Sequence, residues 1–143
     1  MSLARDAERQ FCIVRADDVV RLAPMKQSRI ILLVEDDADL RKMYRVALML
    51  GGFAVREAAD GLDALMVLDR EGADLVVLDL RMPRLTGFDV LADLRARNQH
   101  VPVVVVTALP GDHSDLGVEC VLKKPTAPET LVETVQRCLE QHV

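Results

Sequence analysis

The stretch Asp74-Leu75-Val76-Val77-Leu78-Asp79-Leu80-Arg81-Met82-Pro83 decides how this chain of 143 residues is organised. Its four consecutive apolar residues, 75–78, predict a short strand that is buried on both faces. The carboxylate of Asp79 follows directly, and Pro83 prevents the strand from continuing. In open α/β sheets, ligands bind at the carboxyl ends of the strands. Asp79 is therefore either a functional carboxylate or a solvated acid at a strand end, and the rest of the chain has to decide between the two.

The segments around this stretch alternate between apolar runs and amphipathic patterns from residue 30 onward. Strands are predicted at 30–34, 53–58, 74–78, 101–107 and 119–122. Helices are predicted at about 38–50, from the cap Asp60 to Gly72, from the cap Thr86 to Asn98, and from the capping box at 126–129 to the C-terminus. This alternation predicts an α/β fold with a parallel sheet and helices on both of its faces.

Each predicted helix has an apolar stripe at three- and four-residue spacing that we expect to face the core. The stripes consist of Leu40, Met43, Ala47 and Leu50; Leu65 and Leu68; Phe88, Leu91 and Leu94; and Leu131, Val135 and Leu139. Between the last two strands the pattern fails, because residues 109–115 read as turn chemistry. A fourth helix there is expected to be shortened or missing.

Residues 1–27 do not match the rest of the chain, and we predict an N-terminal extension of uncertain order before a domain at 28–143. The extension is rich in charged residues. Residues 11–14 and 19–20 suit either two short strands around Asp17-Asp18 or one frayed helix, and the sequence does not choose between them.

Composition restricts the function. The net charge is −5, and aromatic residues make up 3% of the chain, so a direct nucleic-acid partner is not expected. There is no apolar run of membrane-spanning length and no signal peptide, so no membrane partner is expected. The sparse cysteines Cys12, Cys120 and Cys138 are interpreted as free thiols, which places the protein in the cytoplasm.

Polar residues stand at the ends of four predicted strands. These are Glu35 and Asp36 after the first strand, Asp79 after the third, Thr107 at the end of the fourth and Lys124 after the fifth. If those strands are neighbours, the five side chains converge on one pocket. Crowded carboxylates without imidazole or thiolate favour Mg²⁺, which also takes phosphate oxygens as ligands. Lys124 and Thr107 then suit an anion such as a phosphoryl group, and Asp79 is the best candidate for its acceptor.

Four motifs that carry these residues resemble the signature of the response-regulator receiver domain, the CheY-like module of two-component signalling. They are Leu33-Val34-Glu35-Asp36-Asp37, Val77 to Pro83 with Gly87, Val105-Val106-Thr107-Ala108, and Lys123-Lys124-Pro125. The resemblance covers about residues 28–143. It implies a flavodoxin-like sheet of order 2-1-3-4-5, for which CheY is itself the standard example.

The resemblance also assigns roles. Asp79 would be the phosphoacceptor, Asp36 a direct ligand of Mg²⁺, Glu35 a ligand through water, and the backbone carbonyl of Arg81 a further ligand. Thr107 would be the switch hydroxyl, and Lys124 would pair with the phosphate, with a cis peptide bond before Pro125. Gly87 would allow a positive φ after Pro83. From the residues alone, Asp37 is interpreted as a helix cap and Lys123 as a solvated neighbour.

Two departures from the family pattern affect signalling. The position three residues before the pairing lysine, usually aromatic, is Val121, and the segment between Thr107 and Lys124 is short. Arg81 and Leu109, each two positions past a key residue, carry no carboxylate or amide that would position an attacking water. Receiver domains commonly use the face that carries this short segment for partner docking and dimerisation, so the resemblance does not predict how this chain does either.

The expected function is that of a single-domain response regulator phosphorylated on Asp79 by a histidine kinase or phosphotransfer protein. It would catalyse its own phosphorylation and dephosphorylation without being an enzyme for a separate substrate. Output would be binding of an unidentified downstream protein or phosphorelay, and a homodimer is allowed. The alternatives are a degenerate receiver used as a constitutive interaction or dimerisation module and, more weakly, an enzyme on the same fold. A nucleotide-binding protein would need a glycine-rich turn where residues 35–37 are acidic.

Overall fold

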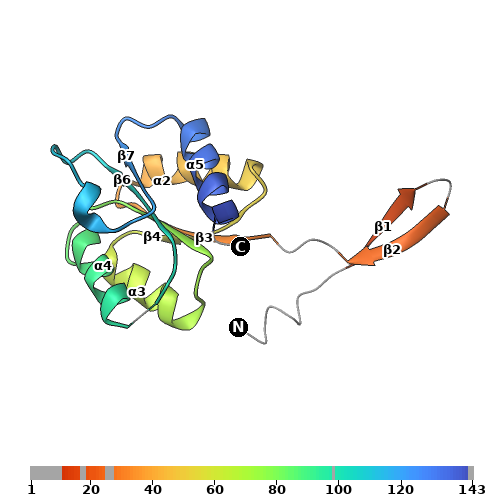
Figure 1. The fold of residues 1–143 in the computed structure, drawn as a ribbon, viewed down its shortest axis with the longest axis horizontal. Coiled ribbons are helices and arrows are strands. Elements are labelled where there is room, and N and C mark those ends of the chain that lie inside the picture. The colour runs from red at the N-terminus through yellow and green to blue at the C-terminus, as the bar shows by residue number, and fades with distance from the viewer. Residues whose placement is uncertain (1–10, 17–18, 25–27, 98, 142–143) are drawn as a thin grey trace.

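The computed structural model describes residues 11–16, 19–24, 28–97 and 99–141. Figure 1 shows their arrangement as a ribbon. The elements in chain order are β1 (Phe11–Ala16), β2 (Val19–Pro24), β3 (Ile30–Val34), α2 (Ala38–Leu50), β4 (Ala54–Ala58), α3 (Gly61–Arg70), β5 (Leu75–Leu78), α4 (Gly87–Ala96), β6 (Val103–Thr107), the short 3-10 helix η1 (Ser114–Leu116), β7 (Cys120–Lys123) and α5 (Pro128–Gln141).

The five strands from β3 onward form one parallel sheet in the order β4-β3-β5-β6-β7. In the chain order of these five strands this is 2-1-3-4-5, so the expected fold is confirmed. Val34 lies beside Leu78, Leu78 beside Val105, and Thr107 beside Lys123. Because all five strands run in the same direction, the ends of β3, β5, β6 and β7 meet at one edge of the sheet.

Helices cover both faces of the sheet, as Figure 1 shows. One core cluster joins residues of α2 and α5 to the sheet, and the other joins residues of α3 and α4 to the opposite face. Every residue of β5 and β6 is buried, which explains why their sequences are continuously apolar rather than alternating. Asp79 directly follows β5, the buried middle strand of the sheet.

The core face of α2 differs from the predicted stripe. Tyr44 and Leu48 are buried, whereas Met43 is 44% exposed and Leu50 is 84% exposed. The helix has apolar residues on more than one side, so spacing alone did not identify the side that packs on the sheet and on α5. In α4 the same correction applies to Phe88, which is 42% exposed, while Val90 is buried.

The expected loss of the fourth helix is confirmed. Between β6 and β7 there is only η1, of three residues. Asp112 accepts hydrogen bonds from the backbone N–H and the hydroxyl of Ser114, at 2.9 and 3.0 Å, and so orders the start of this turn. The hydrogen bonds from Ser114 also lower the pKa of the Asp112 carboxyl. Because η1 has only three residues, residues 108–113 before it are not part of a helix and depend on other contacts.

For residues 11–16 and 19–24, the structure shows strands and not a helix. β1 and β2 pair antiparallel, from Phe11 opposite Pro24 to Ala16 opposite Val19, in a sheet of their own. The other residues of the expected extension, 1–10, 17–18 and 25–27, lie outside the described residues, so its extent stays a prediction.

Among the described residues, no helix combines the length and the apolar character that crossing a membrane requires.

Candidate functional site

Three carboxylates from two strand ends come together at the carboxyl edge of the sheet. Glu35 and Asp36 follow β3, and Asp79 follows β5; one carboxylate oxygen from each lies within 4.8 Å of the others. Glu35 and Asp79 are 2% and 5% exposed, while Asp36 is exposed. The neighbouring Asp37 is the helix cap that the sequence predicted, accepting from the N–H groups of Asp39 and Leu40 at 3.0 Å. Of the three acids, Asp36 is therefore the one exposed to solvent.

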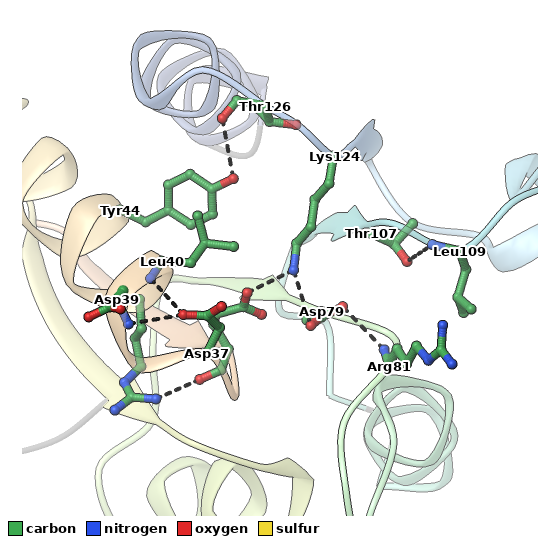
Figure 2. A network of polar contacts seen from close by, with 12 residues as sticks. Asp37, Asp39, Leu40, Tyr44, Asp79, Arg81, Thr107, Leu109, Lys124 and Thr126 are labelled. Atoms are coloured by element: carbon green, nitrogen blue, oxygen red, sulfur yellow. Dashed lines mark hydrogen bonds and ion pairs between the residues drawn. The ribbon is translucent and has the colours of Figure 1, made fainter.

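Lys124 supplies the positive charge of the site. Its ammonium group donates to Oε1 of Glu35 at 2.7 Å and to Oδ2 of Asp79 at 3.2 Å, the second of which can be followed in Figure 2. The Lys124–Pro125 peptide bond is cis, as the resemblance implied. Burial opposes the charge of Lys124, but the two carboxylates outweigh it and the pKa of its ammonium is raised. Lys124 therefore stays protonated beside the two carboxylates.

The acidic cluster fits a hard divalent cation such as Mg²⁺. All three side chains offer carboxylate oxygens, and Oε2 of Glu35 is buried without a hydrogen-bond partner among the described residues. A buried, unpaired carboxylate oxygen is costly, and a cation would satisfy it. Asp36, Asp79 and Glu35 would hold the ion, with the carbonyl of Arg81 as the further ligand that the resemblance implies.

The pKa of Glu35 predicts how cation binding depends on pH. Burial raises the pKa of its carboxyl from 4.5 to about 8; Asp79 acts in the same direction and Lys124 opposes it. An acid whose pKa is raised by folding holds its proton in the folded state while the unfolded chain has lost it. The free energy of unfolding should therefore fall as pH rises between about 4.5 and 8.

Below pH 8, Mg²⁺ must displace this proton, so its affinity should rise with pH up to about 8. Calorimetric titration in two buffers of different ionisation enthalpy should detect proton release on binding. Glu35→Gln should abolish this release. Equal heats in both buffers for the unaltered protein would contradict the assignment.

The loop that follows Asp79 is fastened to the start of α3. Arg84 has φ 65° and its guanidinium pairs with the buried carboxylate of Asp60. The N–H of Gly61 donates to the carbonyl of Leu85 at 3.1 Å. Hydrogen bonds from the backbone of Asp63 and from Arg84 lower the pKa of Asp60, so this anchor is charged at neutral pH. At the start of this loop, the N–H of Arg81 donates to Oδ1 of Asp79 at 3.2 Å and orients that carboxylate.

Gly87 is required for a different reason from the one predicted. The residue of this loop with positive φ is Arg84, and Gly87 is the first residue of α4. A Cβ on Gly87 would lie 2.4 Å from the carbonyl oxygen of Asp79 and 2.7 Å from Cα of Leu80. The glycine therefore allows α4 to approach the backbone of Asp79 itself.

Gly87→Ala should destabilise the protein by about 1–3 kcal/mol, because α4 must move away from the end of β5. Chemical denaturation monitored by circular dichroism would measure the loss. A midpoint equal to that of the unaltered protein would show that the close approach is not rigid.

Thr107 lies at the same edge of the sheet as the acids but is directed away from them. It is fully buried, and its hydroxyl oxygen accepts from the N–H of Leu109 at 3.0 Å (Figure 2). The structure thus places all the predicted site residues at one edge, with Glu35, Asp36, Asp79 and Lys124 in direct proximity. Thr107 would have to leave Leu109 to contact a phosphoryl group.

Sequence reasoning missed Tyr44, which borders the site. Tyr44 is 2% exposed, and its hydroxyl donates to the carbonyl of Thr126 at 3.3 Å, so it joins α2 to the segment after Lys124 (Figure 2). Burial raises the pKa of the Tyr44 hydroxyl. Tyr44 is the only tyrosine of the chain and lies one helical turn from Leu40 of the predicted stripe. That position could have identified it from the sequence.

Known proteins match both the sequence and the fold. The family described as "Response regulator receiver domain" matches residues 31–136. A "Probable transcriptional regulator ycf27" of Porphyridium aerugineum is 37% identical over 121 residues, covering 80% of this chain and 50% of that protein. The "Response regulator MprA" of Mycobacterium leprae is 35% identical over 116 residues, with 78% and 51% covered. The chain spans about half the length of these curated relatives.

Solved structures agree. The chemotaxis response regulator CheY4 of Vibrio cholerae has a TM-score of 0.72 and 30% identity, with 78% of this chain and 99% of that chain covered. The receiver domain of the Francisella response regulator 1452 has a TM-score of 0.77 and 25% identity, with 81% and 100% covered. Both similarities cover nearly the whole of the matched structures.

Proposed function

Because the chain belongs to the response-regulator receiver family, we propose that its domain accepts a phosphoryl group on Asp79 in a Mg²⁺-dependent reaction. The observation that carries the proposal is the contact of Lys124 with both Asp79 and Glu35, beside Asp36. This arrangement pairs a buried nucleophilic carboxylate with a cation site on one side and a fixed ammonium on the other.

The donor is a phosphohistidine of a histidine kinase or phosphotransfer protein. An oxygen of Asp79 attacks phosphorus, the P–N bond breaks, and the imidazole leaves with the electron pair and takes a proton. The product is an acyl phosphate on Asp79. Mg²⁺, when bound, neutralises charge on the transferring oxygens.

The protein's own groups do the rest. The N–H of Arg81 and the ammonium of Lys124 hold Asp79 in one orientation before the reaction. After the transfer, the ammonium of Lys124 pairs with the phosphoryl oxygens, and the Thr107 hydroxyl donates a hydrogen bond to one of them. Phosphorylation is self-catalysed, and there is no separate substrate to turn over. The signal leaves by binding to another protein or by onward relay.

Incubation with Mg²⁺ and acetyl phosphate tests this function without the natural donor. We expect the intact mass to increase by one phosphate that is stable in acid and labile in base, as an acyl phosphate is. A protein that remains unmodified while a known receiver domain is labelled in the same tube would refute the proposal.

The phosphate should be comparatively long-lived. Arg81 and Leu109, the residues two positions past Asp79 and Thr107, carry no carboxylate or amide to orient a water for attack on phosphorus. After the donor is removed by rapid desalting, loss of the phosphorylated mass should extend far beyond seconds. A half-life of seconds would mean that another group activates the water.

A further inference from the structure

Lys123, expected to be a solvated neighbour of Lys124, has a defined contact of its own. Its ammonium donates to the carbonyl oxygens of Leu109 at 2.8 Å and Gly111 at 2.5 Å. Its backbone lies in β7 opposite Thr107, the last residue of β6. The side chain is exposed, but its charged end crosses from β7 to the loop that takes the place of a fourth helix.

Lys123 is linked to Thr107 through Leu109. The carbonyl of Leu109 accepts from Lys123, while the N–H of the same residue donates to the Thr107 hydroxyl. His113 Nε2 lies 3.4 Å from that carbonyl. A lysine on β7 therefore fixes the residue that keeps the Thr107 hydroxyl turned away from the acceptor site.

Pro110 limits the conformations of the segment that Lys123 holds. Pro110 lies between the two acceptor carbonyls, and a proline fixes its own φ and restricts the residue before it to extended conformations. We therefore expect that turning the N–H of Leu109 away from Thr107 displaces the carbonyls of Leu109 and Gly111 as well. That movement breaks the contacts of Lys123, and its ammonium must exchange two charge-assisted hydrogen bonds for water.

Val121, also in β7, stands at the position where receiver domains usually carry an aromatic residue. Its side chain is partly buried against the core cluster on the α3 and α4 face of the sheet. Lys123 contacts the loop from the same strand, and it does so with a group whose bonds depend on the loop's conformation. The hydrogen bonds of Lys123 thus couple the conformation of the loop to β7 without an aromatic residue.

We propose that Lys123 is a positioning residue that latches the loop 108–111 in the conformation with Thr107 bound to Leu109. The inference rests on the proposed function, in which Thr107 must leave Leu109 to reach a phosphoryl group. The latch opposes that switch, so it lowers the affinity of the Asp79 site for a phosphoryl group or a mimic of one. Opening the latch should favour the switched state.

The test compares three variants. Lys123→Met removes the donor and keeps the length of the stem, and Lys123→Arg keeps a cationic donor. Lys42→Met makes the same charge change at an exposed residue of α2. For each protein, two quantities are measured: the affinity for beryllium fluoride with Mg²⁺ present, and hydrogen exchange of the Leu109 amide by nuclear magnetic resonance without either ion.

Lys123→Met should bind beryllium fluoride about three- to tenfold more tightly and exchange the Leu109 amide faster by a similar factor, the scale of a hydrogen bond near the surface. Lys123→Arg and Lys42→Met should resemble the unaltered protein in both quantities. If the unaltered protein binds beryllium fluoride, faster exchange of the Leu109 amide without a gain in affinity would show that Lys123 only tethers the loop, and would overturn the proposal. So would a Lys123→Met protein unchanged in both measurements.

The proposed function fails separately from the latch. If the unaltered protein bound no beryllium fluoride with Mg²⁺ present, the phosphoacceptor assignment would be wrong. Exchange of the Leu109 amide would then decide alone whether Lys123 holds the loop. Faster exchange in Lys123→Met would support the latch in that case, and unchanged exchange would overturn it.

Discussion

Asp79→Asn should take up no phosphate under conditions in which the unaltered protein is fully labelled by acetyl phosphate and Mg²⁺. The amide oxygen of asparagine is a poor nucleophile, and the substitution also removes one of the three carboxylates that would hold the cation. The expected loss is complete by intact mass. The fold should be retained, because Lys124 keeps its stronger contact with Glu35 at 2.7 Å.

Asp115→Asn is the matched control, because this exposed aspartate lies in η1 and has no part in the acidic cluster. It should be labelled as fully as the unaltered protein. If Asp79→Asn were labelled equally, the acceptor would be another residue and the site assignment would fail. If the control also lost labelling, the effect would be one of charge rather than of position.

Removal of Mg²⁺ by a chelator should abolish labelling, and Asp36→Ala should reduce it to a comparable extent at ordinary Mg²⁺ concentrations. Asp36 is the exposed member of the cluster, so its loss removes a ligand without leaving a buried group unpaired. The charge of the transferring phosphoryl group would then face Glu35 without a cation between them. Intact mass after a fixed incubation measures both effects.

Asp39→Ala provides the comparison for Asp36→Ala. It removes the same charge from an exposed residue in the first turn of α2 that is not part of the cluster. Labelling should persist in this variant. Undiminished labelling of the unaltered protein in excess chelator would end the proposed role of the metal.

The strands and the acidic cluster could be predicted because each depends on a short, continuous stretch of the sequence. Residues 75–78 and 103–107 are apolar without interruption and buried throughout, so their sequence alone indicates central parallel strands. The polar residues at their ends then had to share one edge of the sheet. The order of the strands came from the family resemblance, because alternation by itself does not determine it.

The face of α2 could not be predicted, because both of its candidate stripes are apolar. Met43 and Leu50 fit the helical period as well as Tyr44 and Leu48 do, and only packing against α5 and the sheet selects the second pair. Gly87 shows a second limit, since a sequence does not distinguish a glycine with positive φ from one that a neighbouring backbone approaches closely.

Lys123 and Arg84 show a third limit of the sequence. Each binds groups far from it in the chain or on a loop whose path no local pattern predicts: Lys123 reaches carbonyls at 109 and 111, and Arg84 reaches Asp60. A charged residue next to a motif therefore looks solvated in the sequence even when it has a fixed partner. The contacts of Lys123 and Arg84 surround the acidic cluster, and local sequence patterns do not predict them.

Locating the phosphate within the labelled chain tests the central claim most directly. Borohydride reduction converts an aspartyl phosphate to homoserine, and peptide mass mapping then identifies the converted position. The account predicts homoserine at residue 79 and unmodified aspartate at residues 36 and 37. Homoserine at either of those positions, with residue 79 unchanged, would contradict it.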